Sequence, residues 1–168
     1  MRKNFYFSHY IFAYRLVNLQ NIFTLALSTA FFLVFIAACQ SATQVKTGIV
    51  DNRLTPCPSS PNCVCSETQG LKSSISPVNY KTEDAEAWSK AKSTIYKMGG
   101  KIIKQDEQYI HAVFTSRIFH FVDDFELRID KKNKVIHIRS GSRTGYSDLG
   151  VNRKRADKFR EIFKVSNE

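Results

Sequence analysis

The sequence predicts an α+β fold in two layers, with an antiparallel sheet of three to five strands and two helices packed on it. Two segments, 82–98 and 152–165, repeat apolar residues at helical spacing. Between them, residues 101–139 form short runs of alternating apolar and polar side chains separated by polar turns, which is typical of antiparallel strands. The order of helix, strands and helix therefore predicts the fold class.

The first helix is expected to begin near Thr82, a candidate N-cap, and to end at Gly99-Gly100. Acidic residues in its first turn favour the positive end of the helix dipole. Trp88 is expected in the core, because the apolar stripe continues on both sides of it. The stripe consists of Ala85, Trp88, Ala91, Ile95 and Met98.

The strands follow the first helix in series. Residues 101–105 and 109–116 flank the short polar turn 106–108 and are expected to form a hairpin. The same alternation predicts three further strands, at 119–122, 125–129 and 135–139.

The last helix, 152–165, has an apolar stripe that can pack on the sheet and a basic face that can remain exposed. The stripe consists of Ala156, Phe159, Ile162 and Phe163.

Residues 1–38 predict a lipoprotein signal peptide. Three basic residues precede an uncharged apolar run over 22–38, and no acidic residue occurs before Asp51. The run closes on Ile36-Ala37-Ala38-Cys39, which resembles a lipobox, so diacylglycerol is expected on Cys39. An uncleaved transmembrane anchor and an ordinary signal peptide remain the alternatives.

Residues 39–53 are polar and unpatterned and predict a flexible tether, which leaves 54–168 as a single domain. Residue 40 is Gln and not Asp, so the resemblance to sorted lipoproteins implies the outer membrane, facing the periplasm, if the cell has two membranes. The part from Cys39 onward carries 22 of the 25 basic residues and all 15 acidic ones, a net charge of +7. Such a charge favours anionic lipids or glycolipids, since export excludes nucleic acid as the ordinary partner.

Cys57 and Cys63 are expected to form a disulfide. The prolines at 56, 58 and 61 exclude helix and turn the chain back on itself, and an exported protein meets an oxidising compartment. Cys65 is the thiol left over, either buried and inert or a redox partner. A metal site at these cysteines lacks Cys-x-x-Cys spacing and a nearby histidine.

The densest polar segment, 139–153, lies between the last strand and the last helix. It contains three glycines, three arginines and four hydroxyl residues besides Tyr146, and this composition before a helix N-terminus suits an anion site. The structural alternative pairs the arginines with Asp123 and Asp124 and caps the helix with Asp148 or Asn152. The candidate residues of either network are Asp123, Asp124, Arg139, Ser140, Ser142, Arg143, Ser147, Asp148, Asn152 and Arg153.

Three motifs in this order resemble the uncharacterised bacterial family domain of unknown function 1499. They are Cys57-Pro58 to Asn62-Cys63-Val64, Phe121-Val122-Asp123-Asp124, and the run from Arg139 to Arg153. The resemblance spans about 54–163 and implies the domain without implying an activity. Members of that family usually have serine where this chain has Cys65, which weakens a redox role for that thiol.

These observations favour a binding or structural lipoprotein over an enzyme. The loop serines have no histidine partner at readable spacing, and adjacent aspartates in an extended segment splay apart. A hydrolase using the arginine, serine and aspartate residues of the loop is the alternative. No motif predicts a cofactor, no catalytic residue is assigned, and the oligomeric state is left open. The dispersed His111, His120 and His137 predict structural or surface histidines and no metal site.

Overall fold

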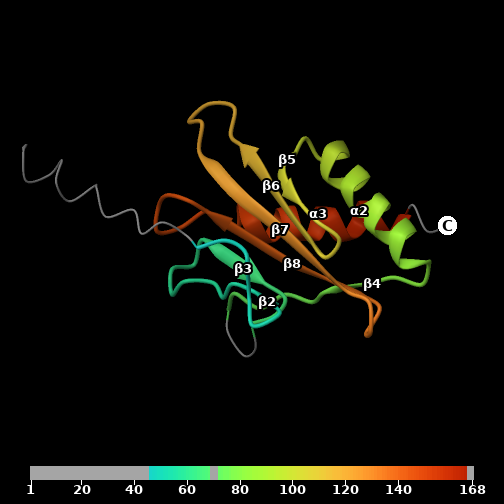
Figure 1. Cartoon of the computed structure of the whole chain (residues 1–168). Helices are drawn as coiled ribbons and strands as arrows, with labels where there is room; N and C mark the ends of the chain where they lie inside the picture. Colours follow the sequence, from blue (N-terminus) through green and yellow to red (C-terminus); the bar gives the residue numbers. More distant parts are fainter. Residues whose placement is uncertain (1–45, 69–71, 166–168) are drawn as a thin grey trace, which may run out of the picture. The chain divides into compact units, whose positions relative to one another are not determined.

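The computed structural model describes residues 46–68 and 72–165 (Figure 1). Residues 43–168 belong to one compact unit. The predicted signal peptide and Cys39 lie outside the described residues. Neither helix in the described ranges has the length and hydropathy that a membrane span requires.

A six-stranded sheet and two helices confirm the two-layer α+β fold. All strand pairings are antiparallel, in the order β3-β8-β7-β6-β5, and β4 pairs with the other end of β8. The sheet is wider than three to five strands because β3 and β4, two very short strands, share the β8 edge. The strands are β3 (Cys63–Cys65), β4 (Val78–Asn79), β5 (Lys101–Gln105), β6 (Tyr109–Thr115), β7 (Val122–Asp130) and β8 (Val135–Ser142).

The strand β5 forms the opposite edge of the sheet. Its register with β6 shifts between Ile102 and Lys104, which marks a bulge. Lys101 and Lys104 of this strand are both exposed.

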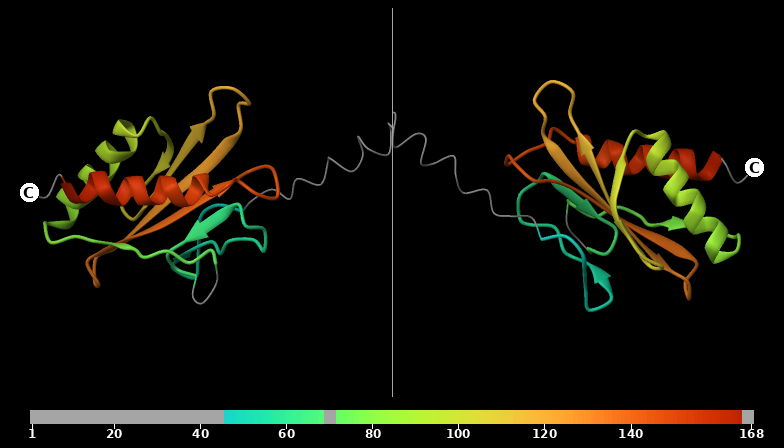
Figure 2. Two further views of the ribbon diagram at one scale, coloured as in Figure 1. Left: turned by 180° about the vertical axis from the view of Figure 1, so that it is seen from behind. Right: turned by 45° about the horizontal axis from the view of Figure 1, so that its top comes forward.

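Helices α2 (Asp84–Lys97) and α3 (Val151–Val165) cover one face of the sheet (Figure 2). Phe125 of β7 packs on Phe159 of α3 with ring centroids 5.4 Å apart, and Trp88 of α2 is buried in the same core. Ala85, predicted on the apolar stripe of α2, is exposed, and Ala87 is buried in the core.

The predicted N-cap of α2 was wrong. The N-cap is Glu83, not Thr82, and no side chain caps the helix there. Asp84 instead accepts a hydrogen bond from the Tyr80 hydroxyl at 2.8 Å and forms an ion pair with Lys134 at 2.8 Å. These contacts tie the start of α2 to neighbouring segments.

The strand predicted at 119–122 was also wrong. Residues 116–121 form the loop between β6 and β7, and only Val122 begins a strand. Ser116 closes the loop, because its backbone N–H donates to the Phe121 carbonyl and its hydroxyl accepts from the Phe121 N–H, both at 2.9 Å. His120 adopts a positive φ of 54° within it.

A small hairpin occupies part of the range expected to be a flexible tether. It consists of β1 (Ile49–Val50) and β2 (Arg53–Leu54), joined by a turn at Asp51 and Asn52, both with positive φ. Leu54 is buried against Tyr109 and Cys65 on the sheet face that the helices leave free. The folded unit therefore begins before Leu54.

Candidate functional site on the charged face of the sheet

The alternation of side chains along β7 separates an apolar face from a charged one. Phe125, Leu127 and Ile129 enter the core under the helices, so Asp124, Glu126 and Arg128 point to the opposite face. These three residues and their partners are called the charged face below. All three are buried, and buried charges require partners.

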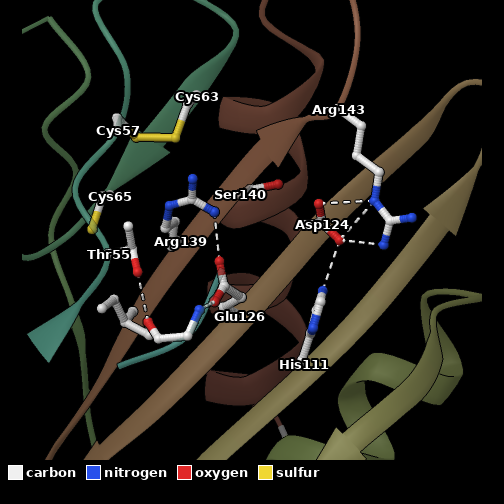
Figure 3. A network of polar contacts seen from close by, with 12 residues as sticks. Thr55, Cys57, Cys63, Cys65, His111, Asp124, Glu126, Arg139, Ser140 and Arg143 are labelled. Carbon is white, nitrogen blue, oxygen red and sulfur yellow. Dashed lines mark hydrogen bonds and ion pairs between the residues drawn. A yellow bond between two sulfur atoms is a disulfide. The ribbon is translucent and has the colours of Figure 1, made fainter. Parts of the chain in front are cut away.

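Glu126 forms the central pair with Arg139, and neither side chain is exposed. The Arg139 Nη1 donates to Glu126 Oε2 at 2.5 Å (Figure 3). Glu126 Oε1 accepts from the Tyr109 hydroxyl at 2.5 Å and from the Gly48 N–H at 2.6 Å. Burial, with the adjacent Glu126 carboxylate, raises the pKa of Tyr109, so its phenol stays protonated and donates.

Arg139 was expected to pair with Asp123 or Asp124 in the structural alternative. The β7–β8 register instead places it opposite Glu126. Its Nε and Nη2 have no hydrogen-bond partner among the described residues.

Asp124 forms a second group with His111 of β6 and with Arg143, the first residue after β8. His111 Nε2 on β6 donates to Asp124 Oδ1 at 2.7 Å, and the Arg143 Nε and Nη2 donate to the same carboxylate at 2.8–3.1 Å. Burial would raise the pKa of Asp124, but these hydrogen bonds outweigh it and hold the pKa below its ordinary value of 3.8. The carboxylate is thus ionised at neutral pH.

Arg143 differs from Arg128 and Arg139, the other two arginines on this face, in its exposure. Its side chain is 45% exposed, while the side chain of Asp124 beneath it is 2% exposed. The pairing engages Nε and Nη2 and leaves Nη1 outside it (Figure 3). One edge of a positioned guanidinium therefore reaches the surface.

The third group lies at the other end of β7, beside an open polar cavity of about 340 Å³. Arg128 Nη2 donates to Glu67 Oε1 at 2.7 Å, and Glu67 Oε2 accepts from the Leu54 N–H at 2.7 Å. In the cavity wall, Ser66 Oγ lies 3.2 Å from His137 Nδ1, and burial lowers the pKa of His137. When Nδ1 carries no proton, it can accept a hydrogen bond from the Ser66 hydroxyl.

The loop serines lie on the helix side and serve the fold. Ser140 Oγ donates to Asn152 Oδ1 at 2.6 Å, and Asn152 Nδ2 donates to Ser142 Oγ and to the Asn62 carbonyl, both at 2.9 Å. All four residues are buried. Asn152 therefore links β8, α3 and the segment before β3 instead of capping the helix with its side chain.

Asp148 provides the cap of α3, because its Oδ2 accepts the Asn152 N–H at 2.7 Å. Ser147, which is exposed, accepts the Leu149 N–H at 3.4 Å. The guanidinium of Arg153 donates to the carbonyls of Ser74 and Lys72, which anchors another loop to α3.

Sequence reasoning missed the partner of Asp123, which is Arg155 on the first turns of α3. Its Nη2 donates to Asp123 Oδ2 at 2.7 Å, and its Nη1 donates to Asn152 Oδ1 at 2.7 Å. Sequence reasoning expected His111 to be a structural or surface histidine but missed its pairing with Asp124, for which the only signal was its place in an alternating strand. Asp123 and Asp124 thus face opposite sides of the sheet and do not form a carboxylate pair.

The disulfide between Cys57 and Cys63 is present, as predicted. Cys65 is a free thiol with no exposed surface, and its Sγ accepts the Glu67 N–H at 3.4 Å. Burial raises the pKa of Cys65, which disfavours the reactive thiolate. In the described ranges, no group of histidine, cysteine and carboxylate side chains is arranged to hold a metal ion.

One family model matches the chain, described as Protein of unknown function (DUF1499), over residues 53–163. No curated protein matches the chain. The matched range contains all three groups of the charged face apart from the Gly48 N–H, and it contains the disulfide.

Proposed function

The chain belongs to the DUF1499 family, and we propose that its domain is held on a membrane as an envelope lipoprotein and binds phosphate groups of anionic lipid or glycolipid. The observation that carries the proposal is the half-exposed guanidinium of Arg143, held in position by Asp124. An arginine that is already oriented loses less conformational freedom when it binds a phosphate.

Arg143 cannot supply the attraction alone, because Asp124 compensates part of its charge. Two further cations, Arg117 in the β6–β7 loop and Lys154 in the first turn of α3, are exposed near the same end of β7 and β8. Individual exposed ion pairs are weak, so useful affinity requires several cations acting together. The net charge of +7 from Cys39 onward also favours attraction to anionic surfaces.

The alternative, a hydrolase on the polar loop, has less support. Ser140 and Ser142 are buried and bonded to Asn152, so neither presents a free hydroxyl to a substrate. A nucleophilic serine needs an adjacent base, and within the described residues Ser140 and Ser142 bond to Asn152 and Arg155 and not to a histidine.

The test compares charge changes at the two ends of the sheet in the fragment 43–168, which contains the whole compact unit. Arg117→Gln and Arg143→Gln each remove one cation at the proposed surface, and Lys132→Gln removes an exposed cation from the β7–β8 turn. Binding is measured to phosphatidylcholine vesicles with and without phosphatidylglycerol, and thermal unfolding is recorded on the same samples.

Each cation near an anionic surface contributes about 1 kcal/mol, so Arg117→Gln and Arg143→Gln are each expected to weaken binding about fivefold. Lys132→Gln is expected to leave it unchanged. Arg117→Gln is the decisive variant, because it does not disturb the buried Asp124. Equal effects of Arg117→Gln and Lys132→Gln, or no dependence on phosphatidylglycerol, would contradict the proposal.

A further inference from the structure

The loop between β6 and β7 exposes three large apolar side chains in a run of four residues. Ile118 is 80% exposed, Phe119 70% and Phe121 55%. The two phenylalanine rings stack on each other, with centroids 5.6 Å apart. Single exposed apolar residues are ordinary, but a group of this size marks an interaction surface.

A second loop, between β8 and α3, repeats the pattern at the same end of the strands. Tyr146 is 77% exposed and Leu149 is 88% exposed. The two loops leave neighbouring strand ends, because the Arg143 N–H donates to the Val122 carbonyl at 3.1 Å. Leu149 also adopts a positive φ of 53°, so the fold tolerates an unfavourable backbone to hold an exposed leucine there.

We propose that the β6–β7 loop inserts Ile118, Phe119 and Phe121 into the acyl region of the bilayer, with Tyr146 and Leu149 at its surface. The inference rests on the proposed function, which places the domain on a lipid surface. Beyond that function, the inference identifies which part of the molecule enters the lipid.

The charges around the loop fit a lipid occupant. Residues 116–122 contain no carboxylate; Arg117 directly precedes the apolar residues, and His120 lies between Phe119 and Phe121. Arginine can keep its guanidinium at phosphate level while adjacent apolar groups enter the acyl region. The next residues, Asp123 and Asp124, are buried and paired with Arg155 and Arg143, so they present little negative charge to a membrane.

The length of chain before the fold permits this orientation. Gly48 is fixed at Glu126, near the middle of β7. The four residues from Glu126 to Val122 span about 13 Å of strand. The nine residues from Cys39 to Gly48 can extend about 30 Å, so a lipid on Cys39 leaves the domain free to turn the loop toward the bilayer.

The experiment uses the full chain, extracted from membranes and reconstituted into phosphatidylcholine vesicles with brominated acyl chains. Phe119→Trp reports lipid contact at the loop, and Val50→Trp is the matched control on the β1–β2 hairpin, where Val50 is 55% exposed. The single native tryptophan, Trp88, is buried and provides a constant background. Brominated chains are expected to remove most of the fluorescence of the tryptophan at position 119 and to leave that at position 50 unchanged.

Absence of quenching at position 119, or equal quenching at both positions, would overturn the insertion. Unquenched protein that sediments as a dimer would assign the apolar loop to a second copy of the chain and would overturn it as well. These vesicles contain no anionic lipid, so insertion is measured separately from the binding of anionic lipid. Weaker phosphatidylglycerol binding by Arg117→Gln with no quenching would leave the proposed function standing without insertion.

Discussion

At the residue scale, the charged face shows how a carboxylate can be buried at a sheet surface. Asp124 is 1% exposed, yet His111 of the adjacent strand β6 and Arg143, just after the end of β8, satisfy it. The resulting low pKa of Asp124 links its ionisation to folding, because the unfolded chain binds the proton more readily than the folded chain does.

This linkage predicts an acid-dependent loss of stability. The contribution of Asp124 is fully present above its ordinary pKa of 3.8 and is lost as the pH falls below 3.8 through the lower folded value. Asp124→Asn is expected to reduce the free energy of unfolding at neutral pH and to flatten its decline below pH 3.8. Urea unfolding of both proteins at a series of pH values measures this, and parallel curves would refute the linkage.

Arg139 supports a second prediction, because removing one partner of a buried pair leaves an uncompensated charge. Arg139→Gln is expected to lower the free energy of unfolding by about 3–5 kcal/mol, since Glu126 then keeps only the Tyr109 and Gly48 donors. The double variant Glu126→Gln with Arg139→Gln should recover part of that loss. Urea unfolding provides the measurement, and strictly additive effects would show that the pair is not coupled.

At the level of helices and strands, the sequence predicted those elements that contain enough residues to show a repeating pattern of apolar and polar side chains. Helices α2 and α3 and strand β5 appear within a few residues of the expected ranges, and β8 extends beyond its expected end to Ser142. β3 and β4 have three and two residues, too few to show a period, so the sequence could not reveal them. The segment 119–122 was predicted as a strand because aromatic residues such as Phe119 and Phe121 are common in strands, and the sequence does not show that these two are exposed in a loop.

The pairs of the candidate site were predicted only in part. Asp124 with Arg143 was among the expected pairs, since both motifs are rich in charge. The partners Glu126 for Arg139 and Arg155 for Asp123 depend on strand register and on how α3 lies over the sheet. Neither quantity can be read from the spacing of residues along one chain.

The disulfide closes the segment before β3 on itself, and Asn62, next to Cys63, ties this segment to the end of β8 and the loop that follows it. The Asn62 carbonyl accepts from the Ser142 N–H at 3.0 Å, and its Nδ2 donates to the Gly145 carbonyl at 2.5 Å. Closing so short a loop is worth about 2 kcal/mol, so the variant with Cys57→Ser and Cys63→Ser should lose about that much stability.

Urea unfolding measures the loss, and Cys65→Ser is the matched control. A serine hydroxyl can also accept the Glu67 N–H, so we expect little change in folding from this substitution. A larger loss in Cys65→Ser than in the double variant would contradict the assignment of the structural role to the disulfide.

At the scale of the whole molecule, the proposals share one assumption, which is the lipid on Cys39. The mature protein extracted from membranes is expected to begin at Cys39 and to carry acyl chains, and each buried methylene contributes about 0.8 kcal/mol to retention. Intact mass spectrometry tests this directly. An unprocessed N-terminus, or a mature form without lipid, would refute the anchor.

A domain held on a membrane meets its neighbours in two dimensions, at a far higher local concentration than in solution. Any free strand edge then becomes a template for polymerisation between adjacent molecules. The β5 edge carries two exposed lysines and a bulge between Ile102 and Lys104, which repel a second strand and interrupt the regular row of backbone donors and acceptors. The irregular β5 edge would therefore let molecules lie close together on a membrane without their sheets pairing edge to edge.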